Sequence, residues 1–198
     1  MKPLFLALLI ACFATAHGAQ YEHREHGSHL HGHAQMNIAW SGHEVEIELL
    51  SPAMNLVGFE HAVSSEADHE AVEAAVARLR QPLALISPNR SADCTVERIE
   101  IESKLMSAHH DDEHEHEHGK EAHHDHDDEH DEYREEQHSD FTVHIGYHCD
   151  APGNLGTIDA RGLFDVFSGM QEIEVQWISD SRQSGAELKP SNTLIRLQ

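Results

Sequence analysis

Basic residues are scarce in this chain. It carries 13 Lys and Arg against 36 Asp and Glu, a formal net charge of −23 at pH 7. A nucleic-acid backbone requires a basic protein surface, so this composition argues against DNA and RNA as partners. A surface with such an excess of negative charge attracts cations instead.

Long apolar segments are also missing from most of the sequence. Leu4–Phe13 is apolar but too short to span a bilayer, and no later stretch is longer. A basic start, this apolar run and the small residues after it are typical of a secretory signal peptide. We predict a signal peptide over residues 1–16, alternatively 1–19, and no membrane span. Cys12 lies in a lipobox-like sequence, so processing as a lipoprotein is an alternative.

Cysteine is rare, and only Cys94 and Cys149 remain once the signal peptide is removed. An exported chain meets an oxidising compartment, so an even cysteine count predicts one disulfide. Two separate buried thiols are the alternative.

Catalytic motifs are absent as well. The sequence has no HExxH helix, no G-x-S-x-G elbow and no phosphate-binding glycine loop. We therefore predict that the protein is not an enzyme. A hydrolytic zinc enzyme, with an open coordination position, stays as an alternative.

Histidine, by contrast, is abundant. Residues 109–140, here called the histidine tract, contain ten histidines and fifteen acidic residues. Imidazole and carboxylate are the side chains that suit Zn²⁺ where no thiolate is offered. One alternative is a loop kept for solubility, but such a loop would need only acidic residues. Another is a pH sensor, a role that is compatible with metal binding. The predicted ligands in the tract are His109, His110, His114, His116, His118, His123, His124, His126, His130 and His138.

Alternating apolar and polar residues predict a hairpin near the start of the mature chain. With Ser41-Gly42 as a two-residue turn, Ile38 would face Val45, and all apolar residues would share one face. A helix is predicted over residues 65–79, where Ser65 precedes an apolar stripe at helical spacing.

Two further strands, over residues 93–105 and 141–149, flank the tract. If they pair antiparallel, their cysteines lie close enough to bridge. The tract then belongs to a loop over residues 107–139, which we expect to be disordered without metal because it has almost nothing to bury.

A short helix over residues 163–167 and strands over 173–177 and 188–197 complete the predicted elements. The fold class is α+β: one domain over residues 31–198, with a mostly antiparallel sheet and helices packed on it. Residues 17–30 form a flexible arm in this division.

Six histidines outside the tract are further candidate ligands. His29, His31 and His33 alternate, so in an extended strand they would share one face. A polar, solvated strand end is the alternative for these three. His61 could bind metal together with Glu60 or could cap the following segment, and the others lie on the polar face of the strand after the tract. The full set is His29, His31, His33, His61, His144 and His148.

Several segments together resemble the ZrgA-like family of zinc-regulated periplasmic proteins of Gram-negative bacteria. The segments are HGHAQMNIAW, SPAMNLVGFEH, FTVHIGYHC and GLFDVFSGMQEIEVQWIS, with the tract placed between two cysteine-bearing strands. The resemblance implies a periplasmic protein that captures, buffers or delivers Zn²⁺ for zinc uptake. It implies that His109–His138 is a zinc-binding loop and that His31 and His33 form the HxH that opens the domain. The implied partners are zinc ions and a zinc transporter or another carrier.

Three alternatives remain at this point. Imidazole sites generally bind Cu²⁺ more tightly than Zn²⁺, so the protein could instead serve copper or nickel binding and resistance. It could also be an adaptor that docks on a transporter and delivers no metal itself. The hydrolytic zinc enzyme is the third alternative.

Overall fold

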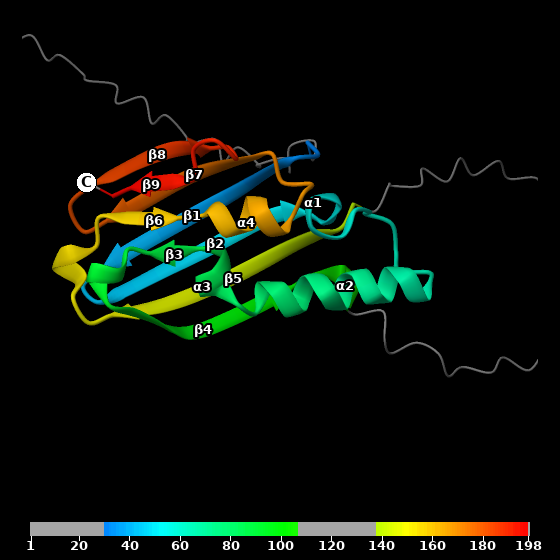
Figure 1. Ribbon diagram of the computed structural model, residues 1–198, viewed down its shortest axis with the longest axis horizontal. Helices are drawn as coiled ribbons and strands as arrows, with labels where there is room; N and C mark the ends of the chain where they lie inside the picture. The colour runs from blue at the N-terminus through cyan, green and yellow to red at the C-terminus, as the bar shows by residue number, and fades with distance from the viewer. Residues whose placement is uncertain (1–29, 107–137, 198) are drawn as a thin grey trace, which may run out of the picture.

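The computed structural model describes residues 30–106 and 138–197 (Figure 1). Its largest element is a six-stranded sheet, and the strands are β1 (His33–Ser41), β2 (Glu44–Pro52), β4 (Cys94–Glu102), β5 (Asp140–Cys149), β7 (Glu172–Ser179) and β8 (Gln183–Leu188). Their spatial order is β4-β5-β2-β1-β7-β8. All neighbours are antiparallel except β1 and β7, which are parallel. The predicted α+β class with a mostly antiparallel sheet is confirmed.

A second layer covers one face of this sheet (Figure 1). It consists of α2 (Glu66–Leu79), α3 (Pro82–Leu85), α4 (Arg161–Val166) and a small sheet of β3 (Ser87–Pro88), β6 (Thr157–Asp159) and β9 (Leu194–Arg196). The short helix α1 (Ala53–Val57) follows β2, and three 3-10 turns complete the fold: η1 (Arg90–Ala92), η2 (Lys104–Met106) and η3 (Pro152–Asn154).

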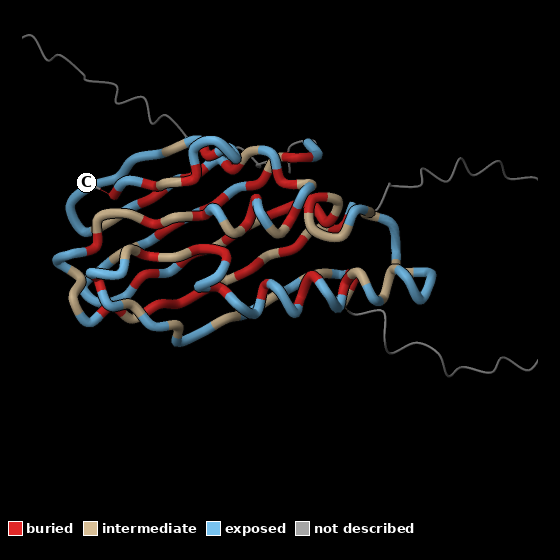
Figure 2. The backbone as a smooth tube through the Cα atoms, in the orientation of Figure 1, coloured by how far each residue is buried: buried red, intermediate tan, exposed pale blue. Residues whose placement is uncertain are grey.

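The opposite face of the main sheet, here called the outer face, is polar. Along β1, β2 and β7, buried residues alternate with exposed or half-buried ones, and Figure 2 shows this alternation along the backbone. Met36, Ile47 and Phe141 are buried under the helices, whereas Asn37, Glu46 and their neighbours point outward. No described helix or strand lies over the outer face.

The β1–β2 hairpin has the predicted strands but a different register. Ser41 pairs with Glu44 and Ile38 with Ile47, so the turn is Gly42-His43 and not Ser41-Gly42. Gly42 has φ +55°, and a positive φ at the first turn position is what a type II′ hairpin turn requires. The register differs from the predicted one by two residues, so every side chain stays on its predicted face.

Helix α2 begins as the sequence predicts. Ser65 Oγ accepts a hydrogen bond from the Asp68 backbone N–H at 3.2 Å, and the Asp68 carboxylate accepts one from the Ser65 N–H at 3.1 Å. This reciprocal capping box satisfies two N–H groups that the helix leaves open. Val72, Ala75, Val76 and Leu79 bury its apolar stripe. Within the two described ranges, none of the helices is long and apolar enough to cross a bilayer.

The C-terminal segment differs from the prediction of one closing strand over residues 188–197. The chain leaves the main sheet after β8 and turns at Lys189–Asn192, whose backbones exchange two hydrogen bonds. Pro190 has no N–H and a fixed φ that suits a turn, so a continuous strand through it is unfavourable. Strand β9 then joins the small sheet instead.

Strands β4 and β5 pair antiparallel, as predicted, and their ends carry the disulfide Cys94–Cys149. The two cysteines are directly opposite each other at the end of the sheet farthest from residues 106 and 138. The bond therefore closes a covalent loop with a sequence separation of 55 that includes the histidine tract.

Tyr147 couples β5 to the second layer. Its side chain is fully buried, and its hydroxyl donates to the carbonyl oxygen of Ile86 at 2.7 Å. Burial raises the pKa of Tyr147 well above its usual range, so the hydroxyl stays a donor at any pH the fold survives.

We predict that Tyr147→Phe lowers the free energy of unfolding by about 1–3 kcal/mol, because the buried Ile86 carbonyl loses its donor. Guanidinium unfolding measures this change. Thr95→Ala, at an exposed position of β4, serves as the control and should stay within about 0.5 kcal/mol of the parent. Equal stability of Tyr147→Phe and the parent would contradict the prediction.

Candidate metal centre

The first feature of the site is a tight turn just before β1. The His33 N–H donates to the Leu30 carbonyl at 3.0 Å, and Gly32 between the histidines has φ +89°. A Cβ at Gly32 would lie 3.0 Å from the Gln171 side chain, so only glycine fits without strain. The predicted extended strand through His31 is therefore wrong, and β1 begins at His33.

The turn sends the two histidines to different carboxylates. His31 Nε2 lies 3.3 Å from Glu60 Oε1, whereas His33 Nδ1 lies 3.4 Å from Glu172 Oε1. Lys189 also contacts Glu172 at 3.3 Å, so that carboxylate already has a cation. The HxH consequently does not act as one pair of neighbouring ligands.

Asn55 of α1 holds this turn in place. It is 3% exposed. Its Oδ1 accepts from the Gly32 N–H at 2.7 Å, and its Nδ2 donates to the His33 carbonyl at 2.9 Å. On the other side, the Gly32 carbonyl accepts from the N–H groups of Gln171 and Glu172 at 2.8 and 2.9 Å. These bonds fix the backbone that carries His31.

Glu60 lies just beyond α1, where Gly58 ends the helix with φ 87°. His138 approaches the same carboxylate from the end of the histidine tract, and its Nδ1 donates to Glu60 Oε2 at 2.7 Å. The next residue, Ser139, accepts a hydrogen bond through its carbonyl from the Ala53 N–H at 2.8 Å. The Glu60 cluster, defined as His31, Glu60 and His138, thus joins three segments that are far apart in sequence.

The carboxylate of this cluster is buried while its imidazoles are open. The Glu60 side chain is 10% exposed, against 55% for His31 and 43% for His138. Burial acts to raise the pKa of Glu60, but the hydrogen bond from His138 and the close approach of His31 outweigh it and hold the pKa below its usual value. Glu60 is therefore an anion at neutral pH.

These donors suit zinc. Two imidazoles and one carboxylate are donors that Zn²⁺ accepts, at about 2.0–2.2 Å. The three ligand atoms do not all lie within 4.8 Å of one another, so the exposed rings would have to move to surround an ion. Among the described residues, the buried Glu60 Oε1 accepts no hydrogen bond of good geometry, so it retains acceptor capacity for a cation. An ion would take the place of the proton between imidazole and carboxylate.

A second group of potential ligands lies at the other end of β5. One ligand atom each from Glu44, Glu97 and His148 falls within 4.8 Å of the other two. His148 Nδ1 donates to Glu44 Oε1 at 2.7 Å, and this bond is the main reason why the pKa of His148 is raised. These three residues are called the His148 cluster below.

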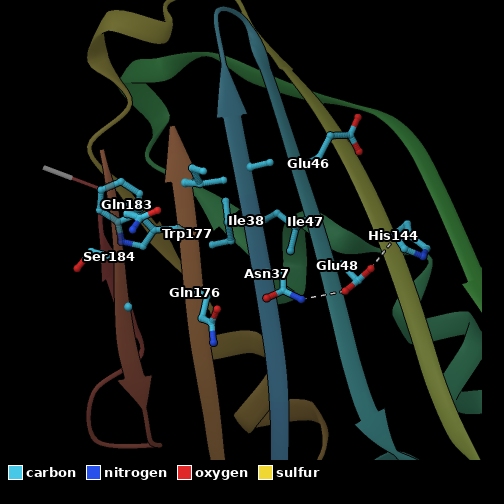
Figure 3. Close-up of a pocket in the computed structure, with 13 residues that line it drawn as sticks. Asn37, Ile38, Glu46, Ile47, Glu48, His144, Gln176, Trp177, Gln183 and Ser184 are labelled. Atoms are coloured by element: carbon cyan, nitrogen blue, oxygen red, sulfur yellow. Dashed lines mark hydrogen bonds and ion pairs between the residues drawn. The ribbon is translucent and has the colours of Figure 1, made fainter. Parts of the chain in front are cut away.

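His144 lies on β5 between His138 and His148 in sequence, and Figure 3 shows it beside Glu48. Its Nδ1 is 3.9 Å from Glu48 Oε2, while Glu48 Oε1 accepts from Asn37 Nδ2 at 2.9 Å. All three residues line a shallow pocket on the outer face, which also contains Gln176 and Trp177. Among the described residues, Glu48 is the carboxylate that contacts His144, so His144 does not belong to a group of three potential metal ligands.

A protein-family model described as ZrgA family zinc uptake protein matches residues 28–197. The chain belongs to the ZrgA family. No curated protein matches the chain. The match extends over both clusters and over the histidine tract, and it connects this ZrgA chain with zinc uptake.

The ZrgA fold brings together only some of the predicted ligands. His31 and His138 meet at Glu60, and His148 meets Glu44 and Glu97. His61 does not join the Glu60 cluster: its ring stacks on Phe59 at 4.7 Å, and its Nδ1 lies 2.9 Å from the Ala62 carbonyl oxygen. The predicted ligands His29, His109, His110, His114, His116, His118, His123, His124, His126 and His130 lie outside the described residues.

Sequence reasoning missed two carboxylates of the ZrgA chain, Glu44 and Glu97. Glu44 and His148 are direct partners in the β2–β5 register, as are Glu48 and His144. Aligning the alternating glutamates of β2 with the alternating histidines of β5 would have found both pairs. Glu97 gives no comparable signal, because its position depends on an irregularity in β4.

We predict that Asn55→Ala lowers the free energy of unfolding by about 1–3 kcal/mol, because the buried Gly32 N–H loses its acceptor. It should also weaken zinc binding at the Glu60 cluster, since the turn that carries His31 is no longer fixed. Chemical unfolding and zinc titration measure the two effects. Asn37→Ala, which removes only an exposed hydrogen bond to Glu48, is the control, and an equal effect of both changes would contradict the prediction.

The lowered pKa of Glu60 predicts an acid dependence of metal-free stability. A carboxyl whose pKa is lower in the folded chain than its usual 4.5 stabilises the fold above that pH. This stabilisation is lost as the pH falls through the folded-state value. In the presence of a chelator, Glu60→Gln should therefore lose less stability than the parent between about pH 6 and about pH 3.

Urea unfolding at a series of pH values measures this difference. Glu73→Gln, on the exposed surface of α2, should follow the parent. An acid dependence of Glu60→Gln as steep as that of the parent would show that this carboxyl is not held ionised by its histidines.

Proposed function

We propose that this ZrgA-family chain is a periplasmic zinc-binding protein that captures, buffers or delivers Zn²⁺ for zinc uptake, and that it is not an enzyme. The observation that carries the proposal is the Glu60 cluster. The histidine of the N-terminal turn and the last histidine of the tract meet on one buried carboxylate. An ordered pair of imidazoles is thereby attached directly to an imidazole-rich segment.

The two parts suit different steps. The tract offers many imidazoles and carboxylates, which can collect several ions in varied combinations. In the Glu60 cluster both imidazoles already contact one carboxylate, which favours tighter binding because fewer groups must be ordered. His138 belongs to both parts. A zinc ion held by the tract is therefore tethered close to the cluster, at a high effective concentration.

The disulfide Cys94–Cys149 supports a periplasmic location, because such bonds persist in oxidising compartments. The predicted signal peptide, which lies outside the described residues, would direct the chain there. A zinc transporter or another periplasmic carrier is the proposed acceptor of the ion.

Exposure of the imidazoles supports a carrier over an enzyme. His31 and His138 are both about half exposed, so the side chains of an acceptor protein can reach a bound ion and exchange ligands. A catalytic site, by contrast, generally closes its reacting groups off from water.

The test is a calorimetric zinc titration of the full chain without its signal peptide. One variant carries asparagine at the nine histidines of residues 109–130, and another carries His31→Ala with His138→Ala. We expect the first variant to lose the numerous weaker ions and to keep a tight one. The second should keep the weaker ions and lose the tight one.

His61→Ala provides a matched control, because its ring stacks on Phe59 outside the Glu60 cluster. It should bind zinc as the parent does. Zinc binding that is unchanged in both test variants, or absent from the parent, would refute the proposal. Ester or peptide hydrolysis that depends on zinc and on Glu60 would favour the enzyme instead.

A further inference from the structure

Three neighbouring strands contribute to the His148 cluster. Glu44 is the first residue of β2, His148 is its direct partner on β5, and Glu97 comes from β4 on the other side of β5. Their ligand atoms lie within 4.8 Å of one another. Two ligands bound tetrahedrally at about 2 Å from a zinc ion are themselves about 3.3 Å apart. The cluster thus needs only side-chain adjustments to surround one ion.

A β-bulge places the second carboxylate. The β4–β5 register shifts between Val96 and Arg98, so Glu97 is the extra residue of β4. In a regular strand two successive residues point to opposite faces, but here Glu97 and Arg98 are both exposed. Bulges re-aim side chains in this way and are frequent next to functional sites. Without the extra residue, the outer face at His148 would have one fewer carboxylate.

The neighbouring cation does not neutralise these carboxylates. Arg98, which follows Glu97, is held by Glu46 at 2.7 Å and also lies 3.8 Å from Glu100. Asp150 adds a third acid at 3.7 Å from His148 Nε2. One imidazole therefore faces three carboxylates, an excess of negative charge that a divalent cation would offset.

The imidazole of the cluster is also held in orientation. The His43 ring stacks on His148 with centroids 5.3 Å apart and planes at 12°. His43 Nδ1 lies 2.7 Å from the carbonyl oxygen of Cys149, and its own carbonyl accepts from the Cys149 N–H at 2.8 Å. Both rings are thus tied to the strand end that the disulfide fixes. Such outer contacts are what keeps a ligating histidine in place.

The His148 cluster is well separated from the Glu60 cluster. Glu44 pairs with His148 at one end of β2, and Pro52 pairs with Asp140, two residues after His138, at the other. At about 3.3 Å per strand residue, these ends are roughly 26 Å apart. One ion cannot bridge the two groups.

We propose that Glu44, Glu97 and His148 form a second ordered site for a divalent cation, independent of the Glu60 cluster. Its ligands are one imidazole and two carboxylates, so it takes an ion that accepts mixed nitrogen and oxygen donors, such as Zn²⁺. With one imidazole instead of two and with more exposed carboxylates, it binds zinc more weakly than the Glu60 cluster. The inference rests on the proposed function only for the choice of ion.

The test uses the full-length mature chain with asparagine at the nine histidines of residues 109–130, so that zinc bound there does not interfere, and with His138 kept. Zinc is added while backbone amide signals are followed by NMR. The amides of Leu30 and Ser139 report on the Glu60 cluster, and those of Cys149 and Asp150 report on the His148 cluster. We expect both sets to shift, with the second set saturating at higher zinc concentration.

Glu97→Gln should weaken zinc binding at the second site by about 10-fold or more, because even the loss of a residue that only supports a ligand costs roughly 10- to 100-fold in affinity. It should not change the zinc response of Leu30 and Ser139. Glu100→Gln removes an acid from an exposed position on the same strand, and it serves as the control that should change neither set.

The two proposals fail in different ways. If Leu30 and Ser139 shift while Cys149 and Asp150 do not, the second site is refuted and the Glu60 cluster stands. If only Cys149 and Asp150 shift, the second site stands and the proposed function loses its ordered site. Equal weakening by Glu97→Gln and Glu100→Gln would show general charge attraction and would overturn the inference.

Discussion

The pairing of β2 with β5 is the interaction on which the rest of the structure depends. It joins the N-terminal hairpin to the strand that follows the histidine tract, along nine residue pairs from Glu44–His148 to Pro52–Asp140. On the inner face this register stacks Val45 on Tyr147 and Ile47 on Ile145, and so forms the centre of the core. On the outer face the same register sets glutamates against histidines. The packing of the core and the pairing of glutamates with histidines on the outer face therefore both follow from one alternation.

Much of the fold follows from local patterns in the sequence. Period-two alternation identified β1, β2 and β5, and the Ser65 cap identified the start of α2. The cysteine pair was predicted correctly because it needed only the antiparallel pairing of two strands at their far ends. In each case the signal lies within a few residues or in a single pair, where physical rules are strongest.

The features that the sequence did not predict depend on distant or subtle contacts. The parallel pairing of β1 with β7 joins segments more than 130 residues apart and leaves no local signature. The turn at Gly32 depends on hydrogen bonds to Asn55, which is 23 residues away in sequence. The bulge at Glu97 adds one residue to an otherwise regular strand, and nothing in the local sequence requires it. The sequence therefore singles out candidate histidines, whereas the groups that they form with carboxylates depend on the fold.

Both clusters contain a histidine hydrogen-bonded to a carboxylate, and they differ in how far that carboxylate is exposed to water. A carboxylate accepts a hydrogen bond from a histidine Nδ1 at 2.7 Å in each, so a proton occupies the position that an ion would take. A cation bound at either Nδ1 would displace that proton, to the other ring nitrogen of a neutral imidazole or to solvent from an imidazolium, so an imidazolium competes with the ion. The Glu60 carboxylate is buried, whereas the Glu44 side chain is 53% exposed, so the two places differ in how strongly water competes.

The position of the disulfide has a consequence for the integrity of the molecule. Cys94 and Cys149 lie on either side of the histidine tract in sequence, with a separation of 55. A peptide bond cut between Glu102 and Asp140, where β4 ends and β5 begins, leaves the two fragments covalently joined, and the β4–β5 ladder still aligns them. A nicked molecule therefore keeps both strands of its sheet, and the cut becomes visible only after reduction. The disulfide thus allows the folded domain to stay intact after a proteolytic cut in the histidine tract.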